Sequence, residues 1–219
     1  MYNLNVHDCG KKKGHCFLWN ETIAARGSEE IASCLLHYFE KNDIRGNTLV
    51  AISDNCCGQN KNWNMVLFWQ HLISMGRFKV VEHHFTVSGH TMLPSDRDFA
   101  TIENYTCRQI PEVFSPGQWA DVIRKSCKKN PFHVYEMSRH DFYKISNLKE
   151  SFVLRNKTTA GQAVNLRDVY RLKIEIDNPM SVFVTQTFCN NVWQEVSLRK
   201  RGKPSCLQKL QLKYQAWET

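Results

Sequence analysis

The spacing of apolar and polar residues in the first part of the chain predicts two strands followed by a helix. Residues 2–6 alternate apolar and polar side chains, as a half-buried strand does, and residues 16–19 form a second strand-like run. A helix is expected over residues 28–42, because two glutamates in its first turn complement the positive end of the helix dipole. The chain therefore opens with a strand pair that leads into a helix.

The middle of the chain continues with strands and helices in alternation. Residues 49–52 are continuously apolar, which is typical of a strand covered on both faces in a parallel or mixed sheet. Further apolar runs predict a helix, a strand and another helix at residues 63–75, 78–87 and 95–107. Such alternation after an initial strand pair predicts an α/β fold with a sheet of mixed direction, flanked by helices.

The second half of the chain has weaker patterns. A helix is expected near residues 119–128 and a strand near 132–137, and three later runs predict a small antiparallel β unit, at residues 169–176, 181–188 and 192–198. We therefore predict a main domain over residues 1–150 and a β-rich extension with a basic tail over residues 151–219.

The charge distribution indicates a polyanionic partner. The chain has 29 Lys and Arg against 21 Asp and Glu, which leaves a formal charge of +8. The excess is clumped at residues 11–13, 124–129 and 199–203, and clumped positive charge can neutralise a row of phosphates. The alternative interpretation of each run is a solvated surface.

The compartment follows from the apolar runs and the cysteines. No apolar stretch approaches the roughly 20 residues that cross a bilayer, and no secretory leader is visible, so we expect a nuclear or cytosolic protein that is not secreted and makes no membrane contact. Nine cysteines without a CxxC pair predict reduced, buried thiols.

The strongest candidate for chemistry is Asp54, directly after the apolar strand. Ligands of open α/β sheets bind beyond the carboxyl ends of the strands, so a rigid element holds this carboxylate where substrate arrives. The polar residues that follow suit contacts to phosphate or sugar, and they are Asn55, Gln59, Asn60 and Lys61. The alternative is an Asp and Asn turn that caps the next helix.

The second candidate segment spans residues 89–103. Asp98, three residues after Ser95, suits a capping box, whereas Asp96 lies at the helix start close to His90. Asp96 and Glu103 share a helix face but stand roughly 10 Å apart along its axis, so one metal ion cannot easily bind both. We favour Asp96 as a metal ligand with Asp54, and Glu103 is the second choice.

The segments YNLNVHD, WNET with ARGSEEIASCL, ISDNCCGQNKN and SGHTMLPSDRDFATIE together resemble a widespread eukaryotic domain associated with transposon-derived proteins. That domain looks like a ribonuclease H-like, DDE-type transposase core, and the resemblance spans roughly residues 1–150. It implies a transposase or nuclease-like function on DNA, with RNA as the alternative partner, and His90 would also contact nucleic acid. It also implies that carboxylates hold Mg²⁺ or Mn²⁺. These metal ions would activate the attacking hydroxyl and stabilise the leaving oxygen.

The resemblance assigns the acids but leaves the set incomplete. Asp54 matches the second acid, and Asp96 or Glu103 matches the last. The first acid would lie on a strand upstream of Met1, because two strands precede the first helix here where the ribonuclease H-like sheet has three; Asp8 and Glu21 are the substitutes within the chain. An incomplete acidic triad leaves this chain by itself without one metal ligand. The alternative function is a binding module for nucleic acid or protein that retains the fold.

Two other chemistries are compatible with the sequence. Zinc would require Cys and His at tight spacing, and the candidates are His7, Cys9, His15, Cys16, His83, His84 and His90. A cysteine nucleophile would be Cys56 or Cys57, with a histidine as its base, but no family-type cysteine signature accompanies them.

Overall fold

The strands form two sheets in the computed structural model, which describes residues 1–219 apart from 88, 90–91, 110–114, 189–191, 200–209 and 215–219. A three-stranded sheet has the order β1-β2-β5, in which β1 and β2 are antiparallel and β2 and β5 are parallel. Its strands are β1 (Tyr2–Asp8), β2 (Lys13–Trp19) and β5 (His133–Glu136). A five-stranded sheet has the order β3-β4-β6-β7-β8, in which β3 and β4 are parallel and all other neighbours are antiparallel. Its strands are β3 (Gly46–Ser53), β4 (Phe78–Phe85), β6 (Arg171–Glu175), β7 (Ser181–Thr185) and β8 (Gln194–Ser197).

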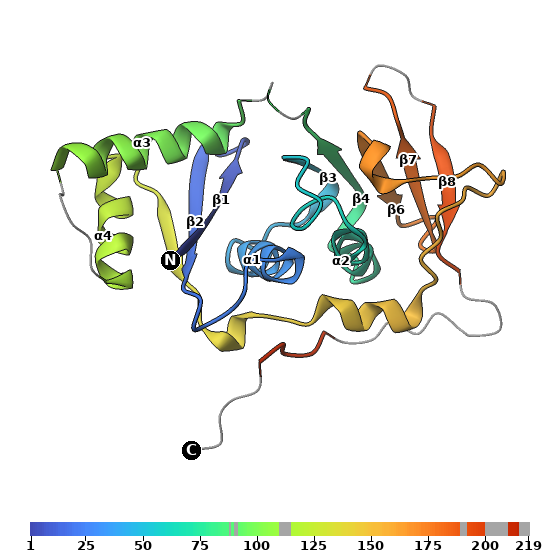
Figure 1. The fold of residues 1–219 in the computed structure, drawn as a ribbon, viewed down its shortest axis with the longest axis horizontal. Coiled ribbons are helices and arrows are strands. Elements are labelled where there is room, and N and C mark those ends of the chain that lie inside the picture. The colour runs from blue at the N-terminus through green and yellow to red at the C-terminus, as the bar shows by residue number, and fades with distance from the viewer. Residues whose placement is uncertain (88, 90–91, 110–114, 189–191, 200–209, 215–219) are drawn as a thin grey trace.

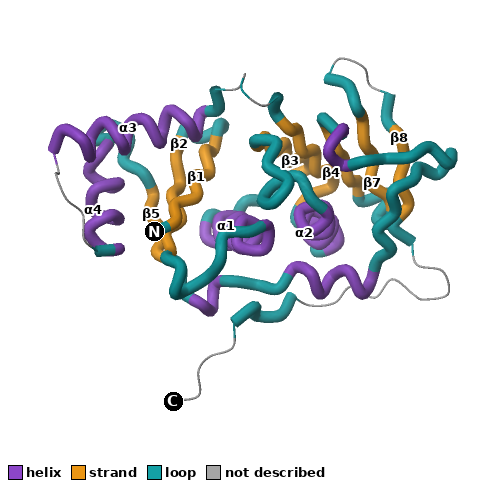
Figure 2. Tube along the Cα trace, viewed as in Figure 1, coloured by secondary structure: helices purple, strands orange, loops and turns teal. Residues whose placement is uncertain are grey.

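The prediction of an α/β fold with mixed strand direction is confirmed, whereas the prediction of one sheet is wrong, because β1 and β3 are not hydrogen-bonded to each other. The strands expected near the C-terminus extend the larger sheet, since β6 pairs with β4. Figures 1 and 2 show the smaller sheet to the left and the larger sheet to the right.

The helices form close to where the local pattern places them. The α-helices are α1 (Ser28–Lys41), α2 (Trp63–Ser74), α3 (Pro94–Gln109) and α4 (Pro116–Ser126), and the 3-10 helices are η1 (Arg139–Asp141), η2 (Ile145–Ser151) and η3 (Leu166–Asp168). At the start of α1 the Glu30 side chain accepts the Gly27 N–H at 3.0 Å, which satisfies an otherwise unpaired donor. None of the helices in the described ranges is both long and apolar enough to span a bilayer.

One hydrophobic core runs beneath both sheets. It joins Phe17 and Trp19 of β2 to the inner faces of α1 and α2 and to buried residues of β4, β6, β7 and β8. A second, smaller core lies on the other side of β2, where Cys16 and Leu18 pack against Ile102 of α3 and residues of α4. The three-stranded sheet is therefore covered on both faces, by α1 on one and by α3 and α4 on the other (Figure 1).

Strand β3 is more exposed than its sequence predicts. Leu49 and Ala51 pack against the main core, but Val50 and Ile52 are 52% and 56% exposed, so the expectation of a strand covered on both faces is wrong. Within the described residues β3 pairs only with β4, and β1 pairs only with β2. Two strand edges above one continuous core thus carry main-chain groups without a ladder partner.

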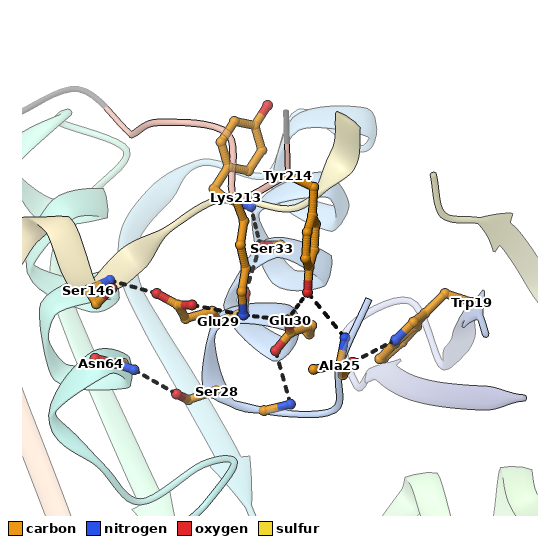
Figure 3. A network of polar contacts seen from close by, with 12 residues as sticks. Trp19, Ala25, Ser28, Glu29, Glu30, Ser33, Asn64, Ser146, Lys213 and Tyr214 are labelled. Atoms are coloured by element: carbon orange, nitrogen blue, oxygen red, sulfur yellow. Dashed lines mark hydrogen bonds and ion pairs between the residues drawn. The ribbon is translucent and has the colours of Figure 1, made fainter. Parts of the chain in front are cut away.

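A C-terminal segment, residues 210–214, docks against the start of α1 (Figure 3). Main-chain hydrogen bonds from Lys144 N–H to Gln211 O and from Lys213 N–H to Phe142 O, each 2.8 Å, hold the segment in place. Lys213 Nζ then reaches Glu29 Oε2 at 2.9 Å and Glu30 Oε1 at 2.6 Å. Residues far apart in the sequence therefore share one partly buried ionic cluster.

Candidate functional site

Asp54 follows the end of β3, and its turn holds one of its carboxylate oxygens. Oδ1 accepts the Cys56 N–H at 3.1 Å and the Asn60 side-chain amide at 2.7 Å. The role of helix cap falls to Asn62 instead, whose side chain accepts the Met65 N–H at 3.2 Å. The alternative interpretation, an Asp and Asn turn that caps the next helix, therefore holds for the turn as a whole, with Asn62 and not Asp54 as the cap of α2.

A series of three hydrogen bonds runs from the buried core to the main chain of Asp54 at the surface. Trp69 Nε1 donates to His83 Nδ1 at 3.1 Å, so the imidazole proton lies on Nε2, which is 2.8 Å from Ser53 Oγ. Ser53 Oγ donates to Asp54 O at 2.9 Å. Burial lowers the pKa of His83 to about 3, which keeps the ring neutral.

Sequence reasoning considered His83 only as a zinc candidate and missed this chain. The signal that could have found it is a histidine within an otherwise buried strand pattern, one strand away from a serine that directly precedes the candidate acid. Both His83 and Trp69 are almost fully buried, at 2% and 1% exposure. Each side chain in this hydrogen-bond series donates to an acceptor of the next residue. The end of β3 therefore has one preferred arrangement.

Asp96 lies at the start of α3 and performs the capping that we expected of Asp98. Its Oδ2 accepts the Leu93 N–H at 2.7 Å, and its own N–H donates to Leu93 O at 3.0 Å. Asp98 instead contacts His7 Nδ1 of β1 at 2.8 Å. The prediction for Asp98 was wrong because the capped position before α3 is Leu93 and not Ser95, two residues earlier than predicted, so the acid three residues further on is Asp96 and not Asp98.

Asp54 and Asp96 line the same cavity, of about 390 Å³. Its other lining residues are Asn55, Cys56, Thr86, Val87, Gly89 and Leu93. Among the described residues no group hydrogen-bonds to Asp54 Oδ2 or Asp96 Oδ1, so each carboxylate has one anchored and one free oxygen. Asn55 Oδ1 is also buried and without a hydrogen-bond partner.

The other predicted site residues are distributed differently. Asn55 lines the cavity and Asn60 supports Asp54, whereas Gln59 and the exposed Glu103 do not line it. His90 lies outside the described residues. The cavity therefore gathers two of the three predicted acids.

Lys61 is not among the residues that line the cavity. Its side chain is 3% exposed, and Nζ donates to Arg167 O at 2.5 Å and lies over the rings of Phe85 and Tyr170. Burial lowers its pKa, because the charged form loses water contacts. In this arrangement Lys61 connects the Asp54 turn to η3 and is not accessible to a phosphate, contrary to the predicted nucleic-acid contact.

The zinc alternative finds no support in the geometry. Across the described parts of the chain no three His, Cys, Asp or Glu side chains come together as metal ligands. His7 contacts Asp98, Cys16 accepts a hydrogen bond from Asn5, and His83 belongs to the chain that ends at Asp54.

The cysteines divide into buried and exposed groups. The seven described cysteines form no disulfides with one another, and the prediction that they are buried is wrong for Cys9, Cys56, Cys57 and Cys107. Burial raises the pKa of Cys16 to about 11 and that of Cys34 well above its ordinary value.

Thiol labelling should separate these two groups. We expect iodoacetamide to modify Cys56 and Cys57 in the native protein, because both side chains are exposed. Cys16 and Cys34 should react only after denaturation. Mass spectrometry of peptides from native and denatured samples checks this, and rapid native labelling of Cys34 would contradict the packing around α1.

The fold and the cavity define an α/β protein with two mixed sheets and a paired-carboxylate pocket beyond the end of a parallel strand. The chain belongs to the family described as Domain of unknown function (DUF7869), whose model matches residues 5–188. No curated protein and no solved structure matches the chain.

Proposed function

We propose that this chain is a ribonuclease H-like domain of transposase or nuclease type, in which Asp54 and Asp96 bind Mg²⁺ or Mn²⁺ next to a DNA phosphodiester. The observation that carries the proposal is that both carboxylates line one cavity, each with a free oxygen. Carboxylate oxygens with water and substrate phosphate are the ligands that Mg²⁺ prefers. The unpartnered Asn55 Oδ1 adds a third oxygen to the same wall.

The residues of the cavity suit the proposed metal in three respects. Main-chain N–H groups fix the orientation of both aspartates, so little freedom is lost when a cation binds. The hydrogen bonds that run from His83 through Ser53 to Asp54 O support the position of its turn. When bound, a divalent cation would activate a nucleophile and stabilise the leaving oxygen in phosphodiester chemistry.

The unpaired edges of β1 and β3 also support the ribonuclease H-like fold that we propose. A further strand between β1 and β3 would pair both edges, would join the two sheets and would cover the exposed apolar side chains of β3. We propose that this strand carries the first acid, as the resemblance implies. A nuclear or cytosolic location is part of the same proposal.

Mn²⁺ binding tests the proposal on the whole chain. In titrations followed by electron paramagnetic resonance, Asp54→Asn should weaken Mn²⁺ binding by at least about tenfold, because the cavity loses a charged ligand. Asp43→Asn is the matched control: Asp43 is an exposed acid in a left-handed turn conformation that asparagine also adopts, and it should leave binding unchanged. Equal binding by wild type and Asp54→Asn would reject the metal site.

The second candidate function is a binding module without catalysis. It is favoured by the observation that only two of the predicted acids line the cavity, while the described residues hold no larger ligand group. Salt-sensitive DNA binding that survives Asp54→Asn, with no cleavage of supercoiled plasmid in Mg²⁺ or Mn²⁺, would support the module. Cleavage that Asp54→Asn abolishes would support the nuclease.

A further inference from the structure

Two basic runs that are far apart in the sequence lie next to each other at one end of the three-stranded sheet. The turn between β1 and β2 carries Lys11 and Lys12 and leads into Lys13, and the loop before β5 carries Lys128 and Lys129. They are adjacent because β2 and β5 are parallel neighbours, with His15 opposite His133, so both segments enter the sheet at the same end. We call these five lysines the lysine patch.

Asn130 connects the two halves of the lysine patch. Its side-chain amide donates to Lys12 O at 2.7 Å, and its Oδ1 accepts from Lys13 Nζ at 3.1 Å. On the other side of the turn, Asp8 Oδ1 accepts the Lys11 N–H at 3.0 Å, while Asp8 Oδ2 accepts the Tyr38 hydroxyl at 2.8 Å. The positions of the lysines are thus built into the fold.

The charges of the lysine patch are only partly offset within the described residues, where the Asp8 carboxylate interacts electrostatically with Lys11. None of its five ammonium groups forms an ion pair there, whereas nearby Arg124 contacts both Asp121 and Glu136 at 3.1 Å. Burial, and then the charges of Lys13 and Lys11, lower the pKa of His133. The positive potential therefore extends over the neighbouring strand.

We propose that the lysine patch, none of whose five lysines lines the Asp54 cavity, binds the sugar-phosphate backbone of DNA. This inference rests on the proposed function for the identity of the polyanion. Clustered lysines favour a row of phosphates, because each contact releases a condensed counterion. An anionic membrane is disfavoured because none of the exposed large apolar side chains among the described residues belongs to either loop, so the patch has no group to insert into lipid.

The test measures binding of a fluorescent DNA duplex to the full chain by anisotropy at increasing KCl, in EDTA so that no metal contributes. The patch variant is Lys11→Gln with Lys12→Gln, Lys128→Gln and Lys129→Gln. The control variant removes four exposed lysines outside the patch and without ion pairs among the described residues, and it combines Lys79→Gln, Lys144→Gln, Lys149→Gln and Lys157→Gln. Both variants lose the same formal charge, so a difference between them reports on position.

We expect the plot of the logarithm of the DNA association constant against the logarithm of the KCl concentration to be less steep for the patch variant. Its negative slope should shrink in magnitude by about two to four, since each phosphate contact contributes about 0.9. The control should change this slope by less than about one. Asn130→Ala, which keeps every charge but separates the two loops, should weaken binding by a smaller factor than the patch variant. Equal effects of the patch and control variants would overturn the proposal, and so would binding to phosphatidylserine vesicles without binding to DNA.

The outcome is independent of the metal site. Asp54→Asn should bind the duplex in EDTA as the wild type does, because the lysine patch does not include the cavity. If Asp54→Asn loses Mn²⁺ binding while the patch and control variants behave alike, the proposed function stands and the lysine patch fails. If the patch variant alone loses DNA binding and Mn²⁺ does not bind, the lysine patch stands and the metal site fails.

Discussion

Lys213→Met should destabilise the protein by about 2–4 kcal/mol, because it leaves a buried carboxylate without its partner. Glu30 is 1% exposed, and its Oε1 accepts from Lys213 Nζ at 2.6 Å and from the Tyr214 hydroxyl at 3.1 Å (Figure 3). Methionine replaces the aliphatic stem of lysine but not its charge. Urea unfolding followed by circular dichroism measures the loss.

Lys149→Met is the matched control for this prediction. Lys149 is exposed and forms no ion pair within the described residues, so the same substitution should change the free energy of unfolding by less than about 0.5 kcal/mol. The double variant Lys213→Met with Glu30→Gln should be more stable than Lys213→Met alone, because it removes the unpaired buried charge. A loss in Lys213→Met no greater than in the control would mean that residues 210–214 do not dock in solution.

The effect of Lys213 should depend on pH. Burial raises the pKa of Glu29, but the hydrogen bonds from Lys213 and Ser146 outweigh it, so the pKa lies below its ordinary value of 4.5. A carboxylate with a lower pKa in the folded state contributes stability above its unfolded pKa and loses it as the pH falls through the folded pKa. The stability difference between wild type and Lys213→Met should therefore narrow below pH 4.5.

His83→Phe should cost about 2–4 kcal/mol of stability and weaken Mn²⁺ binding by about tenfold. Phenylalanine fills the site but leaves the Trp69 N–H without its acceptor and Ser53 Oγ without its donor. The end of β3 then has no fixed arrangement, so Asp54 is less well positioned. His83→Gln offers both a donor and an acceptor and should restore part of both properties.

His71→Phe controls for the loss of a buried imidazole. His71 is also buried, at 8% exposure, but its Nδ1 has no hydrogen-bond partner, and the residue does not line the Asp54 cavity. It should leave Mn²⁺ affinity unchanged. If His83→Phe and His71→Phe bind Mn²⁺ equally well, the hydrogen bonds of His83 stabilise the fold without positioning Asp54.

The pH dependence of stability provides a further check on His83. Its pKa is about 3 in the folded state and 6.5 as its ordinary value, with burial as the main cause and His84 as the second. The unfolded chain therefore binds more protons between these values, and stability falls as the pH decreases through this window. His83→Gln should show a shallower decline over the same window, because it lacks the titrating ring.

The local elements could be predicted from the sequence because their causes are local. The first helix was expected over residues 28–42 and is observed as Ser28–Lys41, since its apolar spacing and its two first-turn acids lie within the same few residues. The second helix was expected over residues 63–75 and is observed as Trp63–Ser74 for the same reason. The position of Asp54 after β3 followed from the boundary between an apolar run and a polar one.

The errors at Asp98 and Lys61 show where local reasoning fails. Because α3 is capped at Leu93, two residues before the predicted Ser95, the capping role passes from Asp98 to Asp96. Only the contact with His7 on β1 reveals what Asp98 does. Lys61 has the sequence context of a phosphate ligand, but Arg167 O and the rings of Phe85 and Tyr170 enclose it. Those partners come from distant parts of the chain.

The sequence by itself determined the α/β class, most helix and strand positions and the two aspartates that merit testing, because apolar periodicity and capping residues act over a few positions. Tertiary structure decided which strand edges stay open, that Asp54 and Asp96 share a cavity, and that Lys11 and Lys129 belong to one surface. These features depend on strand order and on the parallel pairing of strands. Both are stabilised by contacts between segments far apart in the sequence, such as β2 with β5 and Lys13 with Asn130, which are more than 100 residues apart.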